Sequence, residues 1–237
     1  MEYLFELFGN LPRQGPGDKA ATHRAFACLG DMPPGARLLD VGCGNGAQSH
    51  DLRGLIDGRI AAVDIYPPFV AQARGERIDG VCASMTALPF ARESFDVVWS
   101  EGAIYLMGFA EGLRAWRRLL KPGGGMVVSE MSWFTDNAPQ EARAFWESAY
   151  PAMGKVEDHC AAAQGAGYEV IDTFPLPVKT WWTSLYDPLL EKMPDFRARH
   201  AGDAEAQGVA GETEQEIALF RRYSRHYGYQ FYVLRKA

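Results

Sequence analysis

The sequence has few cysteines and no long apolar run. Four cysteines occur in 237 residues, none at a short spacing from another. This scatter excludes a disulfide framework and the usual zinc spacings, so we expect no metal site and a reducing, cytoplasmic location. No segment approaches the roughly 20 apolar residues of a membrane span. The opening residues, MEYLFELF, lack the basic region and apolar stretch of a secretory signal.

Basic charge is also scarce. The chain has 24 Lys and Arg against 30 Asp and Glu, which gives a formal net charge of -6. This is the wrong sign for a surface that follows phosphates, so we expect a small-molecule partner and neither nucleic acid nor a membrane. Hydrophobic residues make up 47% of the chain, enough for the core of one globular domain.

The most informative stretch that is present is LLDVGCGNG, from Leu38 to Gly46. Its apolar residues fit a parallel strand that is buried on both faces. Gly42, Gly44 and Gly46 then remove side chains where the backbone must turn and approach a ligand. Residues 47–55 can follow as a helix whose N-terminal amides face that ligand. The pattern predicts a loop that wraps a small anionic or zwitterionic molecule.

Strand-like and helix-like segments alternate after this loop, which is typical of a doubly wound, mostly parallel α/β sheet. A helix is expected over 108–120, because its apolar residues recur at helical spacing and Lys121, Pro122 and Gly123 end it. The expected strands cover residues 38–41, 60–63, 81–83, 95–99, 126–129, 168–174 and 229–234.

Two segments rich in aromatic residues, 131–155 and 175–227, interrupt the alternation, and we call them the insertions. The chain shows no internal repeat, so we expect one domain over 1–237. Within it, residues 1–34 are expected to form a helical and loop lid. Residues 35–130 form the core that holds the loop's ligand, and the insertions roof a substrate. The alternative is that the insertions form a satellite core or the contact of a homodimer.

Polar residues stand at the carboxyl ends of the expected strands: Asp40, Asp64, Ser84 and Glu101. Ligands of such sheets bind at these ends, near the point where the strand order reverses. Asp64 lies 64 minus 44, or 20, positions after Gly44, the spacing of an acid that accepts hydrogen bonds from ribose hydroxyls. The alternative role of Asp64 is to cap the next helix.

Two ligand classes fit a glycine loop with such an acid. Gly42, Gly44 and Ala47 satisfy G-x-G-x-x-A, the pattern of an NAD(P)-dependent oxidoreductase. Asp40 and the later strings SMTALPF, SFDVVWSEGAIY and LKPGGGMVVSE favour a second class. In this combination the sequence resembles the class I S-adenosylmethionine-dependent methyltransferases. The resemblance is to the small-molecule branch similar to ubiquinone and menaquinone biosynthesis methyltransferases, and it is closest over 35–130.

The resemblance implies a fold and the parts of a cofactor site. The fold is a Rossmann-like sheet of seven strands with helices on both faces, whose last strand, 229–234, runs antiparallel between the fifth and sixth. Asp40 would order the glycine loop, and Asp64 would bind the ribose. Ser84 stands where many relatives have an aspartate for the adenine amino group, so its hydroxyl or the Met85 amide would replace that contact. The residues implied to bind S-adenosyl-L-methionine are Asp40, Gly42, Cys43, Gly44, Asn45, Asp64, Ile65, Ser84, Met85 and Ser100.

Methyl transfer asks the protein mainly for alignment and desolvation, because the cofactor carries an activated methyl group. A base is needed only for an acceptor that arrives protonated. The candidate catalytic residues are Glu101, Tyr105 and Glu130, each of which could instead be a supporting carboxylate or a core tyrosine. The expected substrate contacts are Trp133, Trp181 and Trp182.

The function predicted from these residues is methyl transfer from S-adenosylmethionine to a small molecule. The alternatives are an NAD(P)-dependent oxidoreductase and an S-adenosylmethionine-binding module without catalysis. The stretch LPRQGPG, residues 11–17, is expected to fold over the cofactor, with Arg13 as a carboxylate partner. We call this stretch the opening loop.

Overall fold

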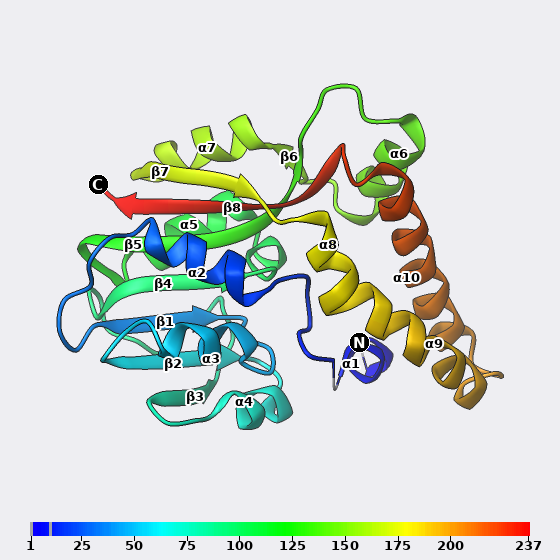
Figure 1. Cartoon of the computed structure of the whole chain (residues 1–237), viewed down its shortest axis with the longest axis horizontal. Coiled ribbons are helices and arrows are strands. Elements are labelled where there is room, and N and C mark those ends of the chain that lie inside the picture. The colour runs from blue at the N-terminus through cyan, green and yellow to red at the C-terminus, as the bar shows by residue number, and fades with distance from the viewer. Residues whose placement is uncertain (1, 10) are drawn as a thin grey trace.

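The computed structural model describes residues 2–9 and 11–237. Its centre is a twisted sheet with the strand order β3-β2-β1-β4-β5-β8-β7 and a short β6 beside β5 (Figure 1). The strands are β1 (Arg37–Val41), β2 (Arg59–Asp64), β3 (Ile78–Cys82), β4 (Phe95–Glu101), β5 (Leu120–Trp133), β6 (Gly154–Lys155), β7 (Tyr168–Pro175) and β8 (Tyr227–Lys236).

The pairing confirms the expected topology. Strands β1 to β5 pair in parallel, and β8 lies between β5 and β7 and runs antiparallel to both. The strand order reverses between β1 and β4. The carboxyl ends of these two strands therefore form the crevice in which this class of sheet binds ligands.

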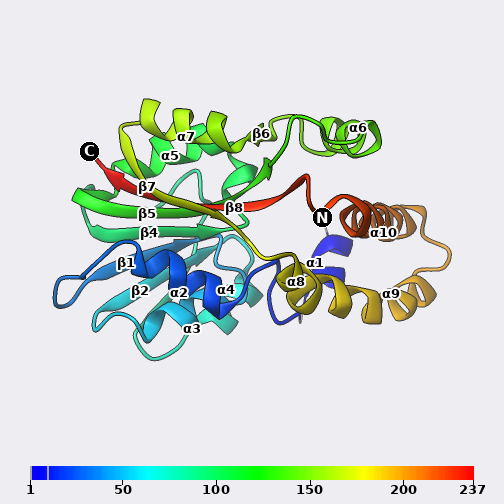
Figure 2. The same cartoon turned by 45° about the horizontal axis from the view of Figure 1, so that its top comes forward.

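Helices cover both faces of the sheet, because successive strand residues point to opposite sides. Leu38 packs with α2, whereas its neighbour Leu39 packs with α5 and α7. Figure 2 shows α5 and α7 over one face and α2 and α3 over the other. The helices are α1 (Glu2–Phe8), α2 (Lys19–Ala27), α3 (Ala47–Arg53), α4 (Pro67–Ala73), α5 (Phe109–Arg117), α6 (Gln140–Ala149), α7 (Val156–Gly165), α8 (Val178–Trp181), α9 (Asp187–Arg199) and α10 (Ala204–Tyr223).

The region between α5 and β5 departs from the sequence-based expectation. The helix predicted over 108–120 ends at Arg117, and β5 already begins at Leu120. Leu120 pairs with Phe95, and the register then shifts before Val97 pairs with Gly125. The extra residues form a bulge, which accommodates Pro122 because a proline cannot donate a ladder hydrogen bond. A further difference is β3, predicted at 81–83 and observed at Ile78–Cys82.

The second insertion and the N-terminal helix form a helical layer beyond the carboxyl ends of the strands. Helices α8, α9 and α10 run away from the sheet, and α1 packs against α9 and α10 (Figure 1). A π-helical turn, Trp182–Tyr186, links α8 to α9. Lys192 of α9 donates to the carbonyl oxygens of Glu6 and Leu7 at 3.3 and 2.6 Å, at the C-terminal end of α1. The N-terminal helix and the second insertion, which are distant in sequence, therefore pack together beyond the carboxyl ends of the strands.

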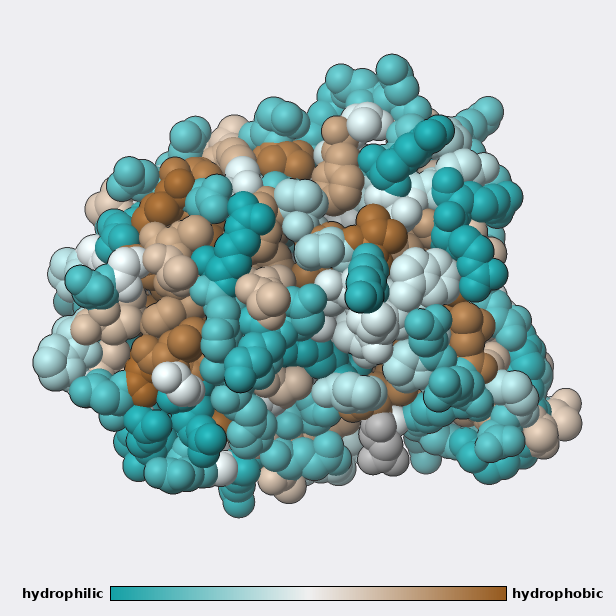
Figure 3. Space-filling model, viewed as in Figure 1, coloured by the Kyte–Doolittle hydropathy of each residue, from teal (hydrophilic) through white to brown (hydrophobic). Residues whose placement is uncertain are grey.

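No helix in the described part of the chain is long and apolar enough to cross a membrane. On the face drawn in Figure 3, hydrophilic residues predominate and the apolar residues form separate patches.

Candidate functional site

A cavity of about 670 Å³ lies where the strand ends meet the helical layer. We distinguish two halves by their lining. The loop half is lined by Gln14, Gly42, Cys43, Gly44, Gln48, Asp64, Ile65, Ser84, Met85, Glu101 and their neighbours. The roof half is lined by Tyr105, Met131, Trp146, Tyr150, Trp181, Tyr186, Glu216, Tyr229 and their neighbours. The halves are continuous, so two ligands bound in them would meet.

The glycine loop has the backbone that its sequence predicts. Gly42 and Gly44 have φ angles of +71° and +53° and line the cavity. A Cβ atom on Gly42 would lie 2.4 Å from the Cβ of Ala103, and one on Gly44 would lie 2.6 Å from Gln14 Oε1. A side chain at either position would be strained and would crowd the space beside the loop.

Asp64 ends β2 and lines the cavity beside the glycine loop. Its Oδ2 accepts a hydrogen bond from the Gly44 amide at 3.0 Å, and its Oδ1 accepts one from the Tyr66 amide at 2.9 Å. The second contact is the cap-like role that sequence analysis left open, since Tyr66 precedes α4. A carboxylate offers about four acceptor positions. Asp64 thus orders the loop and retains capacity for ligand hydroxyls.

Asp40 lies behind the loop and not on the cavity wall. It is fully buried, and its carboxylate accepts hydrogen bonds from Ser49 Oγ at 2.5 Å and Gln48 Nε2 at 3.3 Å. Burial raises the pKa of Asp40 to about 7, against the lowering effect of these two donors. Gln48 itself lines the cavity and also donates to the Cys43 carbonyl. Asp40 therefore ties the end of β1 to Gln48 and Ser49 at the start of α3, directly behind the loop.

The opening loop lies on the glycine loop. Gln14 Oε1 accepts a hydrogen bond from the Asn45 amide at 2.8 Å, and Asn45 Nδ2 donates to the Leu11 and Pro12 carbonyls at 3.0 and 3.1 Å. Asn45, predicted to bind the cofactor, contacts the opening loop and is outside the described cavity lining. Gln14 does line the cavity, and sequence analysis missed it because its partners lie about 30 residues away.

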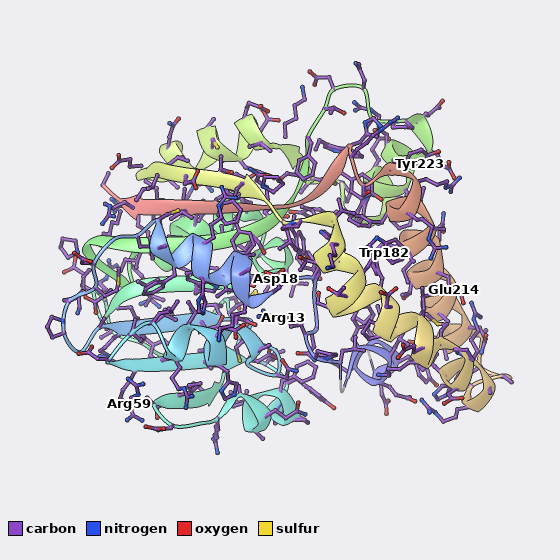
Figure 4. The ribbon with its side chains drawn as sticks, in the orientation of Figure 1. Arg13, Asp18, Arg59, Trp182, Glu214 and Tyr223 are labelled. Atoms are coloured by element: carbon purple, nitrogen blue, oxygen red, sulfur yellow. The ribbon has the colours of Figure 1, made fainter. Side chains whose placement is uncertain are left out.

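Arg13 and Glu101 face the junction of the two loops. Arg13 forms an ion pair with Asp51 and lies 3.5 Å from Glu101 Oε2. Glu101 Oε1 accepts hydrogen bonds from Thr22 at 2.8 Å and from Trp99 Nε1 at 2.9 Å. Burial raises the pKa of Glu101, and the Arg13 charge opposes that shift. Figure 4 shows Arg13 between the sheet and the helical layer.

The rest of the predicted cofactor residues divide into two groups. Ile65, Ser84 and Met85 line the cavity, and the exposed Ile65 side chain offers an apolar surface there. Ser84 Oγ is 2.8 Å from Thr86 Oγ1, so its hydroxyl is engaged locally. Ser100 is fully buried and donates to the Val41 carbonyl at 2.9 Å, which ties the ends of β4 and β1 together outside the described lining.

The three tryptophans predicted to contact substrate occupy different places. Trp181 lines the roof half, is 3% exposed and stacks on Phe220 with ring centroids 4.4 Å apart. Trp133 and Trp182 are outside the described lining. The Arg221 guanidinium lies 4.9 Å from the centre of the Trp182 ring, and Figure 4 shows this ring between α8 and α10. Trp181 therefore forms part of the cavity wall, whereas Trp182 packs outside the cavity, against α10.

Trp146 of α6, one of the insertion aromatics expected to roof a substrate, lines the roof half. Sequence analysis did not single out three further residues of this half: Tyr150 after α6, Tyr186 of the π-helical turn and Glu216 of α10. Aromatic residues in the insertions gave a general signal, but helical periodicity does not say which of them faces a cavity formed with the sheet. Glu216 gave no signal, because charged residues are common along α10.

Two of the candidate catalytic residues differ in access. Tyr105 lines the cavity and is 39% exposed. Glu130 is 1% exposed and outside the described lining, and its Oε1 accepts a hydrogen bond from the Met131 amide at 2.8 Å. Burial raises the pKa of Glu130 to about 8, and the nearby Tyr150 hydroxyl opposes part of the shift. Neither Glu130 Oε2 nor Tyr150 Oη has a hydrogen-bond partner among the described residues.

The loop half fits a nucleoside that carries an amino-acid chain. Glycines leave room at the backbone, Asp64 can accept from hydroxyls, Ile65 offers an apolar face, and Arg13 and Glu101 supply opposite charges. Across residues 2–9 and 11–237, no group of three or more His, Cys, Asp or Glu side chains could hold a metal ion.

Comparisons with known proteins agree with this geometry. The family described as "Methyltransferase domain" matches residues 39–128. A malonyl-[acyl-carrier protein] O-methyltransferase of Herminiimonas arsenicoxydans is 28% identical over 203 residues, covering 79% of this chain and 73% of that protein. A demethylmenaquinone methyltransferase of Corynebacterium urealyticum is 32% identical over 130 residues, covering 53% of this chain and 55% of that protein.

Among solved structures, a methyltransferase from Geobacter sulfurreducens in complex with S-adenosyl-L-homocysteine aligns with a TM-score of 0.82. The two are 19% identical, and the alignment covers 100% of this chain and 98% of the other, which shows a shared fold. The relatives named here are methyltransferases and give no support to the oxidoreductase alternative. The chain is therefore similar to S-adenosylmethionine-dependent methyltransferases, and its residues 39–128 match a methyltransferase domain.

Proposed function

We propose that this protein transfers a methyl group from S-adenosylmethionine, held in the loop half of the cavity, to a small molecule held in the roof half. The observation that carries the proposal is the single cavity, which joins a glycine loop and its ribose acid to an aromatic chamber without a break. When bound, the cofactor supplies a methyl group activated on a sulfonium. The protein's own contribution is to align the acceptor and exclude water.

We assign the cofactor contacts to residues that line the loop half. Gly42 and Gly44 admit the backbone to the methionine part, Asp64 accepts from the ribose, and Ile65 lies against the adenine. Arg13 and Glu101 face the ends of the amino-acid chain. Three other predicted residues support the site without contacting the cofactor. Asp40 holds the glycine loop, Asn45 holds the opening loop, and Ser100 joins the ends of β1 and β4.

We assign Glu101 a positioning role, because two neutral donors and Arg13 already occupy its oxygens. We assign Glu130 a supporting role as well, because it lies outside the described lining and its pKa of about 8 keeps it mostly protonated near neutrality. Tyr105 lies in the cavity wall, where its hydroxyl can orient the acceptor.

We further propose that the insertions close over the acceptor, as a roof distinct from the cofactor site. The aromatic and apolar lining of the roof half supports this, since such side chains exclude water around a small ligand. The acidic net charge and scattered cysteines support a cytoplasmic enzyme acting on a metabolite and not on nucleic acid. A homodimer is a separate proposal, which sedimentation velocity would test.

The direct test is ligand-dependent thermal stability. A ligand that binds only the folded state raises the melting temperature by mass action. We expect saturating S-adenosylhomocysteine to stabilise the protein and NAD or NADP not to. A Gly44→Val variant should lose this stabilisation, whereas Gly202→Val, in an open turn with no neighbour within 4 Å, should keep it. Stabilisation by NAD and none by S-adenosylhomocysteine would overturn the proposal.

A further inference from the structure

The roof half carries a carboxylate whose charge has no basic partner. Glu216 lines this half, and its Oε1 accepts a hydrogen bond from the Tyr186 hydroxyl at 2.7 Å. In the described part of the chain, neither an ion pair nor a second hydrogen bond involves Glu216. Burial is the main cause of the raised pKa of Tyr105 and of Tyr229, and the Glu216 carboxylate adds to both shifts, so Glu216 lies near two other walls of the chamber.

Positive charge is scarce around the whole cavity. Among the described lining residues, Arg13 is the one basic side chain. It lies in the loop half, where Asp51 and Glu101 already pair with it. An acceptor that carries a carboxylate or phosphate would therefore bring a negative charge beside Glu216 with no cation to bind it. Removing such a charge from water without a partner is costly.

A second set of groups points to the same place. Four buried side-chain polar atoms have no hydrogen-bond partner among the described residues: Glu130 Oε2, Trp146 Nε1, Tyr150 Oη and Tyr227 Oη. Trp146 and Tyr150 line the roof half, and Tyr227 packs against Trp146 with ring centroids 5.5 Å apart. Trp146 is 8% exposed. Tyr150 lies near Glu130 and Trp146 near Tyr227, since each opposes the rise in pKa that burial causes in its neighbour, but neither pair makes a full hydrogen bond. Trp146 and Tyr150 therefore keep polar capacity for a ligand on the chamber wall.

Aromatic rings complete the surroundings of Glu216. Trp181 lies 5.7 Å from Tyr186 and 4.9 Å from Tyr229, measured between ring centroids, and Tyr105 and Tyr150 are 5.8 Å apart. All five line the roof half. The faces of such rings attract cations, and the attraction strengthens where water is excluded. One carboxylate within an aromatic chamber is the combination that binds an ammonium group.

We infer that the acceptor is a small amine, bound in the roof half with its ammonium group against Glu216 and the surrounding aromatic rings. This inference rests on the proposed function only in calling the bound molecule the acceptor. The recognition itself depends on the protein's own residues. The Tyr186 hydroxyl occupies one oxygen of Glu216 and leaves the other for the ammonium, and the polar atoms of Trp146 and Tyr150 face the rest of the ligand.

The test compares three probes of nearly equal shape by calorimetry, on protein saturated with S-adenosylhomocysteine at pH 7. The probes are phenethylamine, 2-phenylethanol and phenylacetate, which are cationic, neutral and anionic. We expect the amine to bind at least tenfold more tightly than the alcohol, and the acid not to bind. Glu216→Gln should weaken binding of the amine at least tenfold and leave binding of the alcohol unchanged. Glu216→Asp should recover part of it.

Glu212→Gln is the matched control, because Glu212 is an exposed residue of the same helix. It should leave all three affinities unchanged. If phenethylamine binds no better than 2-phenylethanol, or does not bind, the inference is wrong whatever the Glu216 variants do. If S-adenosylhomocysteine itself fails to bind, the proposed function is wrong. The two failures are therefore distinguishable.

Discussion

At the scale of single residues, Asp64 shows how one side chain both shapes and serves a site. Its two oxygens already accept hydrogen bonds from the Gly44 and Tyr66 amides. The carboxylate therefore fixes the loop before any ligand arrives, and its remaining acceptor positions face the cavity. The proposed ribose contact and the observed contact at the start of α4 can therefore use the same carboxylate.

Replacing Asp64 by alanine should weaken S-adenosylhomocysteine binding by about 1 to 3 kcal/mol, because charge-assisted hydrogen bonds to the ribose are lost. Titration calorimetry measures this directly. Asp79→Ala is the control, since Asp79 pairs with Arg59 on the exposed edge of the sheet. If Asp64→Ala binds as tightly as the wild type while remaining folded, the acid serves only the backbone and the ribose partner lies elsewhere.

At the scale of elements, the order of the sheet could be predicted, but the walls of the cavity could not. Buried apolar runs such as Leu38–Val41 identify strands locally, and the family resemblance places 229–234 between the fifth and sixth strands. By contrast, Gln14 meets Asn45 and Tyr186 meets Glu216 across about 30 residues each. Such contacts depend on tertiary packing, so the spacing of apolar residues along the sequence cannot predict them.

The same limit explains the tryptophans. Trp181 and Trp182 are neighbours in sequence, and both lie in helical turns, so they point in different directions. Trp181 faces the cavity and Trp182 faces α10. Likewise, Leu120 and Pro122 fit the end of a helix by pattern, but pairing of Leu120 with Phe95 begins a strand there instead.

Alanine substitutions should separate the two tryptophans. Trp181→Ala removes a buried ring that stacks on Phe220, so we expect it to cost about 3 to 5 kcal/mol in the free energy of unfolding. Trp182→Ala should cost less, because its ring is only partly buried. Urea unfolding measures both, and S-adenosylhomocysteine affinity should change little in either variant. An equal loss of stability would show that Trp182 belongs to the core as fully as Trp181.

At the scale of the whole molecule, several buried acids lie in or near the cavity, and their hydrogen bonds and ion pairs do not fully offset the cost of burying a negative charge. Burial raises the pKa of Asp40 to about 7 and that of Glu130 to about 8, and it also raises the pKa of Glu101 and Glu216. His159, buried between α7 and the sheet, has its pKa lowered to about 4. The stability of the protein therefore depends on pH through groups that mostly line or support one site.

The signs of these shifts differ. Folded Glu130 keeps its proton up to about pH 8, whereas the unfolded chain releases it near the ordinary glutamate pKa of 4.5. The folded state binds more protons between these values, so stability falls as the pH rises through this window. Neutral His159 works in the opposite direction between about 4 and 6.5. Above pH 6.5 its contribution is complete, and the acids alone determine the slope.

Glu130→Gln should isolate the largest of these contributions. Glutamine resembles the protonated acid and can still accept from the Met131 amide. We expect the variant to match the wild type near pH 5 and to become progressively more stable than it up to pH 8, by at most about 1.4 kcal/mol per pH unit. Urea unfolding at half-unit steps of pH measures the difference, with Glu169→Gln on exposed β7 as the control. A flat difference would mean that Glu130 is ionised in the folded protein, its charge stabilised by Tyr150 and neighbouring groups more strongly than burial opposes it.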